Sequence, residues 1–555
     1  MRENIKDENL DEHQLRLKDS FPSFDTIPDN ARLKTQIHQK SILINGKLIE
    51  WDGPTHMVFS PILVNNSSEG KTEKYLIGSY PLGTPKEASE ALAAAVKAYN
   101  NGRGEWSSMS IGERISHLKD FTYKMVSRKN EIVKLIVWEI GKTFADAEKE
   151  FERTVEYINE TINSAKKLNN STTQFSMAQN FIGQIKRVPH GVVLCMGPFN
   201  YPLNETFTTL IPALIMGNTI LFKPPKHGTL VFQPLLDAFA ESFPIGVVNT
   251  VYGRGRDIVP GLMESGKVDV LALIGSSRVA DRLKKMHPKS NRLKAVLGLD
   301  AKNAAIVLPD ADLSLAVKEV ITGALSFNGQ RCTALKIIFV DVAIVDEFNA
   351  LLVKELKNIK VGMPWQQDVT ITPLAEPDKP AYLKDCIDDA LLHGAGILNA
   401  EDGGGSAYLS LMQPAVIYPV NEKMKLYNEE QFGPVIPIAP FDVLDEPIDY
   451  IINSPYGQQV SIFGQDSQTI AQLIDNLAGQ VGRININSQS QRSPDTFPFN
   501  GRKDSAEGTL SVEEALFAFS VDSVVATKQT QGNEKLLQEI LINNQSRRLN
   551  NSFAF

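Results

Sequence analysis

The amino-acid sequence predicts an α/β fold organised around parallel β-sheets. From His190 onward, short apolar runs alternate with amphipathic segments of helical length, and a second alternation of this kind begins near Lys302. Strands that alternate with helices form parallel sheets whose faces are covered. The 555 residues, 42% hydrophobic and 22% charged, suffice for two or three domains with substantial cores.

The N-terminal part predicts a little β-structure followed by helices. Residues 1–30 are polar and predict a mobile tail. Ser41–Ile49 predicts a hairpin, because its central Asn45-Gly46 pair favours a two-residue turn. Hydrophobic periodicity then predicts helices at residues 85–100, 112–127, 131–140 (between Asn130 as cap and Gly141 as stop) and 144–168 (after Thr143 as cap).

The first alternating run supplies the elements of one parallel sheet. Its last strand, Val268–Ile274, ends in Gly275-Ser276-Ser277 before a helix, and the free amides of such a helix start can hold a phosphate. An ordinary helix cap is the alternative reading. The other predicted strands are residues 192–196, 219–223 and 247–252, and the predicted helices are 203–216, 229–239, a short one after 252, and 278–286.

One of the three cysteines has the surroundings of a nucleophile. Cys332 follows Gly329-Gln330-Arg331 and precedes the apolar strand Ile337–Val340. A cationic, partly exposed turn favours the thiolate, which is the attacking form. Cys195 lies in an apolar strand and Cys386 in an amphipathic helix, so both are expected to be small buried hydrophobic residues.

Two segments outside the alternating runs predict an oligomerisation arm, residues 169–189 and 505–528. Within the second segment, Phe517–Val525 alternates apolar and polar residues. Such a strand outside a domain core pairs readily with another subunit, so we expect a homo-oligomer, a dimer or a tetramer. Residues 529–555 predict a C-terminal tail with a small amphipathic helix around Leu536 and Ile540.

Composition and spacing exclude several classes of partner. The net charge of −8 and the dispersed basic residues give no field for a nucleic acid. The charged segment Met1–Leu10 is unlike a signal or transit peptide, and the longest apolar segment, Leu210–Phe222, is too short and too interrupted to cross a bilayer. The cysteine and histidine spacings predict neither disulfides nor a metal site. We expect a cytoplasmic protein without a membrane partner.

Five motifs occur together in the order and spacing of one enzyme family: Met196–Pro202, Leu221–Pro225, Gly275–Ser277, Gln330–Cys332 and Glu429–Pro434. Over about residues 40–527 the chain resembles the aldehyde dehydrogenase superfamily, and it is most similar to the branch of NADP-dependent, non-phosphorylating glyceraldehyde-3-phosphate dehydrogenases. The resemblance implies a Rossmann-type cofactor domain (31–168 and 190–298), an α/β catalytic domain (299–504) and the β-strand oligomerisation arm.

The resemblance implies oxidation of an aldehyde through a covalent intermediate. The Cys332 thiolate attacks the aldehyde, and the Asn200 amide with the backbone N–H of Cys332 matches the family's donors to the resulting oxyanion. Hydride transfer to the nicotinamide then leaves a thioester. Glu430 matches the residue that holds the nicotinamide ribose, and Phe432 belongs to the same cofactor-binding motif.

The implied cofactor is NADP, with NAD as the alternative. Lys223 matches the lysine that contacts the adenosine ribose. Three residues later, where NAD-preferring relatives often carry glutamate, this chain has Lys226, whose charge suits the 2′-phosphate of NADP. A solvated loop lysine is the alternative for Lys226. Gly275 and Ser276 match the family's cofactor-binding turn.

Four residues match the group that holds the substrate phosphate in this branch: Arg153, Tyr201, Arg331 and Arg492. They lie far apart in the sequence, so they can act together only if the fold gathers them. The implied substrate is a small phosphorylated aldehyde, D-glyceraldehyde 3-phosphate, which is oxidised to 3-phosphoglycerate. Oxidation of another small aldehyde is the alternative.

The match fails where family members usually carry Glu-Leu-Gly-Gly-Lys, whose glutamate activates the water that hydrolyses the thioester. This chain has Gly298-Leu-Asp-Ala-Lys302. Three explanations are open: Asp300 stands in as the base, a non-water acceptor such as coenzyme A takes the acyl group, or turnover is impaired. A binding protein that has kept the fold and lost the chemistry is a further alternative, against which the retained Cys332, Asn200 and Glu430 speak.

Overall fold

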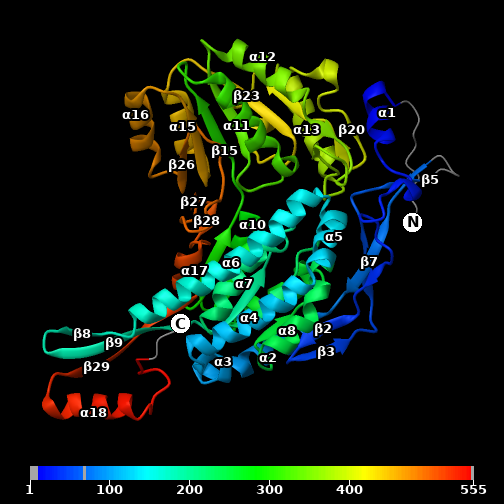
Figure 1. Cartoon of the computed structure of the whole chain (residues 1–555). Helices are drawn as coiled ribbons and strands as arrows, with labels where there is room; N and C mark the ends of the chain where they lie inside the picture. The colour runs from blue at the N-terminus through cyan, green and yellow to red at the C-terminus, as the bar shows by residue number, and fades with distance from the viewer. Residues whose placement is uncertain (1–9, 67–70, 552–555) are drawn as a thin grey trace.

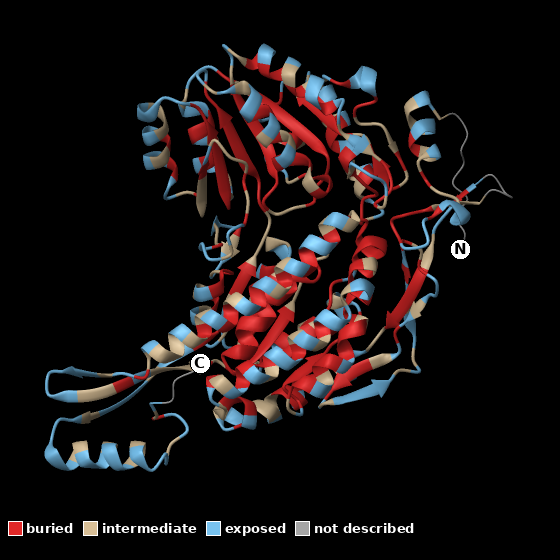
Figure 2. Cartoon of the chain, viewed as in Figure 1, coloured by how far each residue is buried: buried red, intermediate tan, exposed pale blue. Residues whose placement is uncertain are grey.

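The computed structural model describes residues 10–66 and 71–551, which form two α/β lobes and an arm that projects from one of them (Figure 1). The predicted apolar strands are buried at the centre of each lobe, and the amphipathic helices turn their polar faces outward (Figure 2). This arrangement confirms the predicted α/β class with parallel sheets. Among these residues, no helix is long and apolar enough to span a membrane.

The lower lobe in Figure 1 contains a sheet with the strand order β12-β11-β10-β13-β14-β28. All of its pairs are parallel except that of β14 with β28. The chain winds outward from β10 in both directions, as in a Rossmann-type sheet, which binds ligands at the carboxyl ends of strands near this reversal. The strands are β10 (Val192–Met196), β11 (Thr219–Lys223), β12 (Val248–Thr250), β13 (Val270–Ile274), β14 (Lys294–Gly298) and β28 (Ala506–Glu507).

Helices cover this sheet, and several begin or end where the sequence predicts. Thr143 caps the helix that follows it, and Gly141, with a φ of +81°, ends the preceding one. Asn130 is not a cap, because that helix already begins at Lys129. The predicted helix 229–239 is a 3₁₀ segment followed by a short α-helix, because Pro234 interrupts it. The elements are α2 (Pro85–Tyr99), α3 (Glu105–Ser108), α4 (Ile111–Ser127), α5 (Lys129–Ile140), α6 (Phe144–Ser171), α7 (Asn204–Ile215), η3 (Leu230–Leu235), α8 (Leu236–Ser242), α9 (Gly255–Glu264) and α10 (Ser277–Met286).

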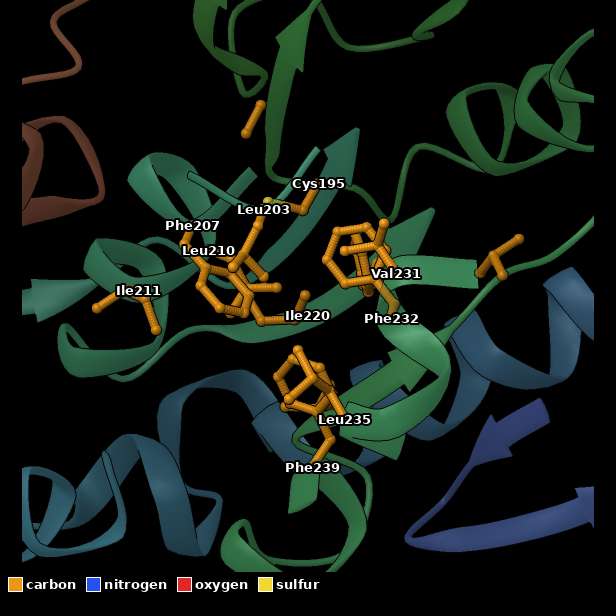
Figure 3. Packing of buried hydrophobic residues seen from close by; sticks show 14 of the residues in the cluster. Cys195, Leu203, Phe207, Leu210, Ile211, Ile220, Val231, Phe232, Leu235 and Phe239 are labelled. Carbon is orange, nitrogen blue, oxygen red and sulfur yellow. The ribbon is translucent and has the colours of Figure 1, made fainter. Parts of the chain in front are cut away.

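Aromatic and aliphatic side chains of α7, β11, η3 and α8 form the centre of this lobe (Figure 3). Phe207, Phe232 and Phe239 are almost fully buried and contact one another edge to face. Cys195 belongs to the same core, where burial raises the pKa of its thiol to about 12. Cys386 is also buried. Both cysteines are therefore packing residues, as predicted.

The upper lobe contains the second sheet, with the order β19-β22-β23-β16-β15-β25-β26. Its pairs are parallel except that of β19 with β22. The strands are β15 (Asn303–Val307), β16 (Leu335–Asp341), β19 (Gly396–Ile397), β22 (Ala415–Tyr418), β23 (Val435–Phe441), β25 (Gln459–Phe463) and β26 (Arg483–Ile486). The helices are α11 (Leu313–Leu325), α12 (Val345–Leu356), α13 (Lys379–Leu392), α14 (Lys425–Asn428), α15 (Asp445–Asn453) and α16 (Ser467–Leu477).

A connecting segment, residues 502–507, joins the two lobes. Its first part, β27 (Arg502–Lys503), pairs with β24 (Tyr456–Gly457) of the upper lobe, and its last part is β28 in the lower sheet. Between them, buried Ser505 accepts from the Gly457 N–H at 3.0 Å and donates through Oγ to the Asp300 carbonyl at 2.8 Å. The segment therefore bonds to both lobes at once.

The arm is a sheet of β8 (Phe175–Ala178), β9 (Phe181–Pro189) and β29 (Ser520–Lys528), followed by α18 (Gln531–Ile542). The prediction of 505–528 as arm is wrong for its first part, since β28 belongs to the lower sheet and α17 (Val512–Ala518) packs on α6 and α7. The strand predicted at Phe517 begins at Ser520, because the preceding residues complete α17. Helix α18 coincides with the predicted C-terminal helix.

The N-terminal region differs from the predicted tail. Residues 10–30 contain α1 (Glu12–Asp19) and a 3₁₀ turn, and they bury Leu17, Phe21 and Ile27, so this part is packed; residues 1–9 lie outside the described residues. The predicted hairpin is present, with φ values of +54° and +73° at Asn45 and Gly46. The strands of this region are β1 (Ile37–His38), β2 (Ser41–Ile44), β3 (Lys47–Glu50), β4 (Thr55–Phe59), β5 (Val64–Asn66), β6 (Lys71–Glu73) and β7 (Leu76–Pro81).

Candidate active site

Cys332 lies in a turn between α11 and β16 that is built on residues with a positive φ. Phe327 and Gly329 have φ values of +48° and +70°. A Cβ at position 329 would lie 2.6 Å from the carbonyl oxygen of Gly433, so a residue other than glycine does not fit there. The turn of Cys332 is thus pressed against the loop that contains Gly433. Cys332 itself is partly exposed.

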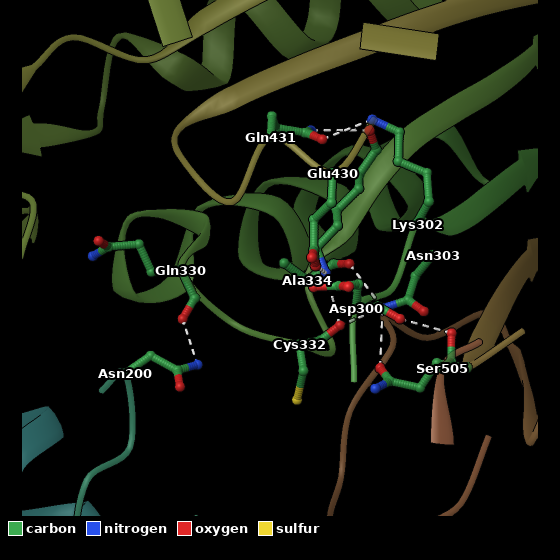
Figure 4. A network of polar contacts seen from close by, with 12 residues as sticks. Asn200, Asp300, Lys302, Asn303, Gln330, Cys332, Ala334, Glu430, Gln431 and Ser505 are labelled. Carbon is green, nitrogen blue, oxygen red and sulfur yellow. Dashed lines mark hydrogen bonds and ion pairs between the residues drawn. The ribbon is translucent and has the colours of Figure 1, made fainter. Parts of the chain in front are cut away.

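Asn200 lies beside Cys332, in the loop between β10 and α7 (Figure 4). Its Nδ2 donates to the backbone carbonyl of Gln330 at 2.8 Å, and the residue is 5% exposed. This bond holds the Asn200 amide against the cysteine turn. Because Nδ2 carries a second hydrogen, the same nitrogen can also donate to an oxygen bound in front of Cys332.

A polar network fixes the backbone of Cys332. The carbonyl oxygen of Cys332 accepts from Asn303 Nδ2 and from Lys336 Nζ, each at 2.8 Å. Lys336 also forms a buried ion pair with Glu430. In Figure 4 the Cys332 side chain points away from this network, which leaves its sulfur free to meet a substrate.

Lys302 extends the network toward the Glu429–Pro434 loop. Its Nζ donates to the carbonyl of Glu429 at 2.6 Å and to Gln431 Oε1 at 2.7 Å. Burial, reinforced by the charge of Lys336, lowers the pKa of Lys302 to about 7. The loop that carries Glu430 is therefore anchored to the strand that carries Lys302.

Opposing charges surround the Cys332 thiol. Burial raises its pKa above the usual range, the carboxylate of Glu205 raises it further, and the cations Lys336 and Arg492 lower it. The neighbouring Arg331 was predicted to favour the thiolate. In the structure, the cations that lower this pKa are Lys336 and Arg492. Lys336 donates to the Cys332 carbonyl, and Arg492 lies far from Cys332 in the sequence.

A cavity of about 410 Å³ lies at the carboxyl ends of β11 and β12. Basic side chains gather in its lining: Lys223, Lys226, Arg254, Arg256 and His56. Burial lowers the pKa of Lys223 to about 8, and burial with the charges of Lys226 and Arg254 lowers that of His56. The cavity thus offers several cationic groups to a phosphate at the place where Rossmann-type sheets bind nucleotides.

Two of the predicted phosphate ligands lie together, held by acidic side chains. Arg153 donates through Nε and Nη2 to the Asp495 carboxylate at 3.0 and 2.7 Å. Arg492 forms a buried ion pair with Glu205, and its Nε lies 3.3 Å from Asp495 Oδ1. Its Nη2 donates to the Leu510 carbonyl at 2.9 Å. Both guanidinium groups are therefore partly neutralised by the protein.

Arg331 and Tyr201 border this cluster. Burial raises the pKa of the Tyr201 hydroxyl, and the nearby charges of Arg331 and Arg153 lower it. Arg331 Nη2 donates to the Gly323 carbonyl at 3.1 Å and to Gln489 Oε1 at 3.4 Å. Within residues 10–66 and 71–551, Arg331 forms no ion pair, and its buried Nε has no hydrogen-bond partner. Among Arg153, Arg331 and Arg492, Arg331 is therefore the arginine without a carboxylate partner within the described residues.

The sequence model of the aldehyde dehydrogenase family matches residues 66–525. The chain belongs to the aldehyde dehydrogenase family. It is 32% identical over 459 residues to an NADP-dependent glyceraldehyde-3-phosphate dehydrogenase of Streptococcus equinus, a match covering 82% of this chain and 92% of the relative. It is 31% identical over 487 residues to malonate-semialdehyde dehydrogenase 1 of Bacillus anthracis, covering 86% and 95%. The crystal structure of NADP-dependent glyceraldehyde-3-phosphate dehydrogenase from Bacillus halodurans C-125 complexed with NADP superposes with a TM-score of 0.80 at 31% identity, covering 89% of this chain and all of that one.

This aldehyde dehydrogenase has Gly298 where the family usually has its water-activating glutamate. Gly298 ends β14, and a Cβ built there would lie 3.2 Å from Leu510 Cδ1 and 3.5 Å from Ile274 Cγ1. Apolar side chains therefore border the position. A longer side chain at 298 requires Leu510 to move.

Asp300, the possible stand-in for the missing base, is hydrogen-bonded to Ser277. Its Oδ2 accepts from the backbone N–H and from the hydroxyl of Ser277, each at 2.8 Å. Asp300 thereby occupies the start of α10, for which the sequence left two readings open, a phosphate site at Gly275 and Ser276 or an ordinary helix cap. Its carboxylate is engaged with this helix, so it is no longer the simplest candidate for the missing base.

Several residues of this aldehyde dehydrogenase site were not predicted from the sequence. Lys336 gave a usable signal, because a lysine inside the apolar strand β16 needs a buried partner. Arg254 and Arg256 gave none, since charged residues after a short strand are ordinarily solvated. Glu205 follows the Met196–Pro202 motif and Asp495 follows Arg492, but only the fold shows that they contact the arginines.

Proposed function

We propose that the protein oxidises a small aldehyde that carries an anionic group, using NADP⁺ as the hydride acceptor and Cys332 as the nucleophile. The observation that carries this proposal is the proximity of the Cys332 thiol to Arg492, within a cluster that also holds Arg153 and borders Arg331. D-Glyceraldehyde 3-phosphate, oxidised to 3-phosphoglycerate, is the first substrate to test, because the relatives include enzymes named for it.

In the proposed reaction, Cys332 adds to the aldehyde carbon, and the oxygen becomes an oxyanion. The free N–H of Asn200 and the backbone N–H of Cys332 would donate to this oxygen, and loss of one such donor typically costs about a hundredfold in kcat or more. Bonds from Asn303 and Lys336 hold the Cys332 backbone, so the second donor is fixed in advance. Expulsion of hydride then converts the thiohemiacetal to a thioester.

The cationic cavity fits the adenosine end of NADP. Lys226, Arg254 and Arg256 would face the 2′-phosphate, and Lys223 would contact the ribose. Glu430, with its partner Lys336, and Phe432 would hold the nicotinamide ribose. The bound cofactor supplies the hydride acceptor, and these residues orient it. The start of α10 does not fit a phosphate in this structure, because Asp300 fills it.

A second candidate substrate is a semialdehyde with a terminal carboxylate. The cluster of Arg153, Arg331 and Arg492 is opposed by Glu205 and Asp495, and the three positive and two negative groups leave one net positive charge. One net charge matches a carboxylate better than a phosphate dianion. The malonate-semialdehyde dehydrogenases among the relatives agree with this alternative.

The deciding experiment measures NADPH formation by the purified protein without inorganic phosphate. D-Glyceraldehyde 3-phosphate, 3-oxopropanoate and unphosphorylated glyceraldehyde are compared by kcat/KM, with NAD⁺ in place of NADP⁺ as a second arm and coenzyme A as an optional acyl acceptor. We expect an anionic aldehyde with NADP⁺ to be the best pair. Cys332→Ser should abolish oxidation and keep NADP⁺ binding, because a neutral hydroxyl has no matched base here. Turnover by Cys332→Ser, or preference for the uncharged aldehyde, contradicts the proposal.

A further inference from the structure

Glu205 is a buried carboxylate beside Arg492, one of the cations proposed to bind an anionic substrate. It lies in the first turn of α7, directly behind the loop that carries Asn200, and it is 6% exposed. Its carboxylate forms an ion pair with Arg492, which is also 6% exposed. Its charge also reaches Cys332, whose pKa burial raises first and Glu205 raises next.

The protein engages most of the guanidinium of Arg492, although its buried Nε forms no hydrogen bond. Nη1 faces Glu205, Nη2 donates to the Leu510 carbonyl at 2.9 Å, and Nε lies 3.3 Å from Asp495 Oδ1. The ring of Phe499 covers one face of the guanidinium, 4.6 Å from its central carbon. A substrate phosphate would therefore compete with these acceptors for the guanidinium of Arg492.

Among these acceptors, Glu205 is the one whose displacement matters most. The Leu510 carbonyl is neutral, and Asp495 is shared with Arg153, which holds it by two hydrogen bonds. Within the described residues, the Glu205 carboxylate has one hydrogen-bonding partner, Arg492. Because it is tethered to α7, it competes at a high effective concentration with any free anion.

We propose that Glu205 is a specificity residue: it is the built-in counter-ion of Arg492 and restricts the binding of dianionic aldehydes. This inference rests on the anion site of the proposed function and assigns its charge preference. Arg331, which has no carboxylate partner among the described residues, then makes the main contact with the substrate anion. Glu205 leaves the site with one net positive charge, and its neutralisation would leave two.

The test compares Glu205→Gln with the wild type by titration with inorganic phosphate at constant ionic strength, which holds screening fixed. The amide keeps the shape of Glu205 and removes its charge, so phosphate should bind at least about tenfold more tightly. Glu241→Gln, which neutralises an exposed surface carboxylate paired with Lys124, is the matched control and should change nothing. The added substitution Arg492→Gln should cancel the gain.

Substrate kinetics provide the second readout. In Glu205→Gln, kcat/KM for D-glyceraldehyde 3-phosphate should rise at least about tenfold relative to kcat/KM for unphosphorylated glyceraldehyde. Phosphate affinity that does not increase in the folded variant overturns the inference. A similar loss of kcat for charged and uncharged aldehydes also overturns it, because Glu205 would then act on the chemistry.

Single substitutions of the two arginines give a check that leaves Glu205 unchanged. If Glu205 already neutralises Arg492, then Arg492→Gln should weaken phosphate binding less than Arg331→Gln does, and the reverse order contradicts the inference. Tighter phosphate binding by Glu205→Gln, together with no oxidation of any anionic aldehyde, would disprove the proposed function and leave the role of Glu205 supported. The two failures are therefore distinguishable.

Discussion

At the scale of single residues, the departure at Gly298 has the largest kinetic consequence. The residues that we propose for thioester formation surround Cys332, whereas Gly298 stands where the base for thioester hydrolysis was expected. Leu510 and Ile274 border the position with apolar atoms, and Asp300 is held by Ser277. We therefore expect acylation to be fast and hydrolysis slow.

Rapid mixing with NADP⁺ and substrate should give a burst of NADPH followed by slow turnover. Gly298→Glu alone should bring little improvement, because its Cβ meets Leu510 at 3.2 Å. Gly298→Glu combined with Leu510→Ala should raise the steady-state rate by about a hundredfold and keep the burst amplitude, since general-base catalysis contributes about that much. Leu510→Ala alone is the control. Absence of a burst in the wild type would show that hydrolysis is not limiting.

The thiol of Cys332 gives a prediction about pH. The rate of alkylation by iodoacetamide follows the thiolate, so in the cofactor-free protein it should increase as pH rises through a pKa that burial has raised. Lys336→Met removes a cation and should shift the profile to higher pH. Glu205→Gln removes an anion and should shift it to lower pH. Cys332→Ser identifies the labelled residue, and profiles that do not move apart would place these charges outside the thiol's environment.

The residues around Cys332 divide into those that the sequence predicts and those that only the fold reveals. Cys332 and Asn200 were predicted from motifs, and the structure places them side by side. The position of Lys336 in an apolar strand indicates a buried partner, but the partners of Lys336 and Glu205 could not be predicted, because each lies about a hundred or more residues away. Asp300 remains an untested candidate for the base: its place two residues after Gly298 suggested that role, and only the fold shows that its carboxylate accepts from the backbone N–H of Ser277.

At the scale of elements, helix caps and hydrophobic periodicity predicted the helices well, whereas the short strands and the packed N-terminal segment were not predicted. Thr143, Gly141 and the Asn45-Gly46 turn act locally, so their positions follow from the sequence. The N-terminal residues 10–30 were misjudged as a tail, because their few apolar side chains are buried only by distant parts of the chain, such as Tyr408 beside Phe21. Short strands such as β27 and β28 have no sequence pattern of their own.

The loops that follow β11 and β12 lead to a prediction about cofactor choice. Lys226→Glu combined with Arg254→Gln should weaken NADP⁺ binding by at least about tenfold and leave NAD⁺ binding within about threefold, because only NADP⁺ loses charge-assisted bonds to its 2′-phosphate. Fluorescence titration of both cofactors checks this. Lys267→Glu, an exposed charge reversal beyond the cavity, is the matched control. Equal losses for both cofactors would mean that these cations serve the fold.

At the scale of the whole molecule, the arm extends away from both lobes, and much of it is exposed (Figure 2). On β29, Val521, Val524 and Val525 are between 43% and 60% exposed. A strand with such a surface is a site for association with another subunit. This feature supports the predicted homo-oligomer.

Val524→Lys should shift the protein toward smaller assemblies, because a charge would have to be buried in the contact. Light scattering after size exclusion measures the molar mass, and Asp522→Lys on the same strand tests whether any added lysine has this effect. If the wild type is already monomeric, or if the mass is unchanged in Val524→Lys, the exposed valines do not mediate assembly.

The connecting segment 502–507 should restrict rotation of one lobe against the other. It crosses from β24 to β14, and Ser505 bonds the two lobes together through the Gly457 N–H and the Asp300 carbonyl. A hinge rotation that parted the lobes would have to break this short ladder, so cofactor and product should exchange through movements of loops alone. The amide hydrogens of Gly457 and Leu299, the latter bonded to the Ser505 carbonyl, should then resist exchange with deuterium until the whole molecule unfolds.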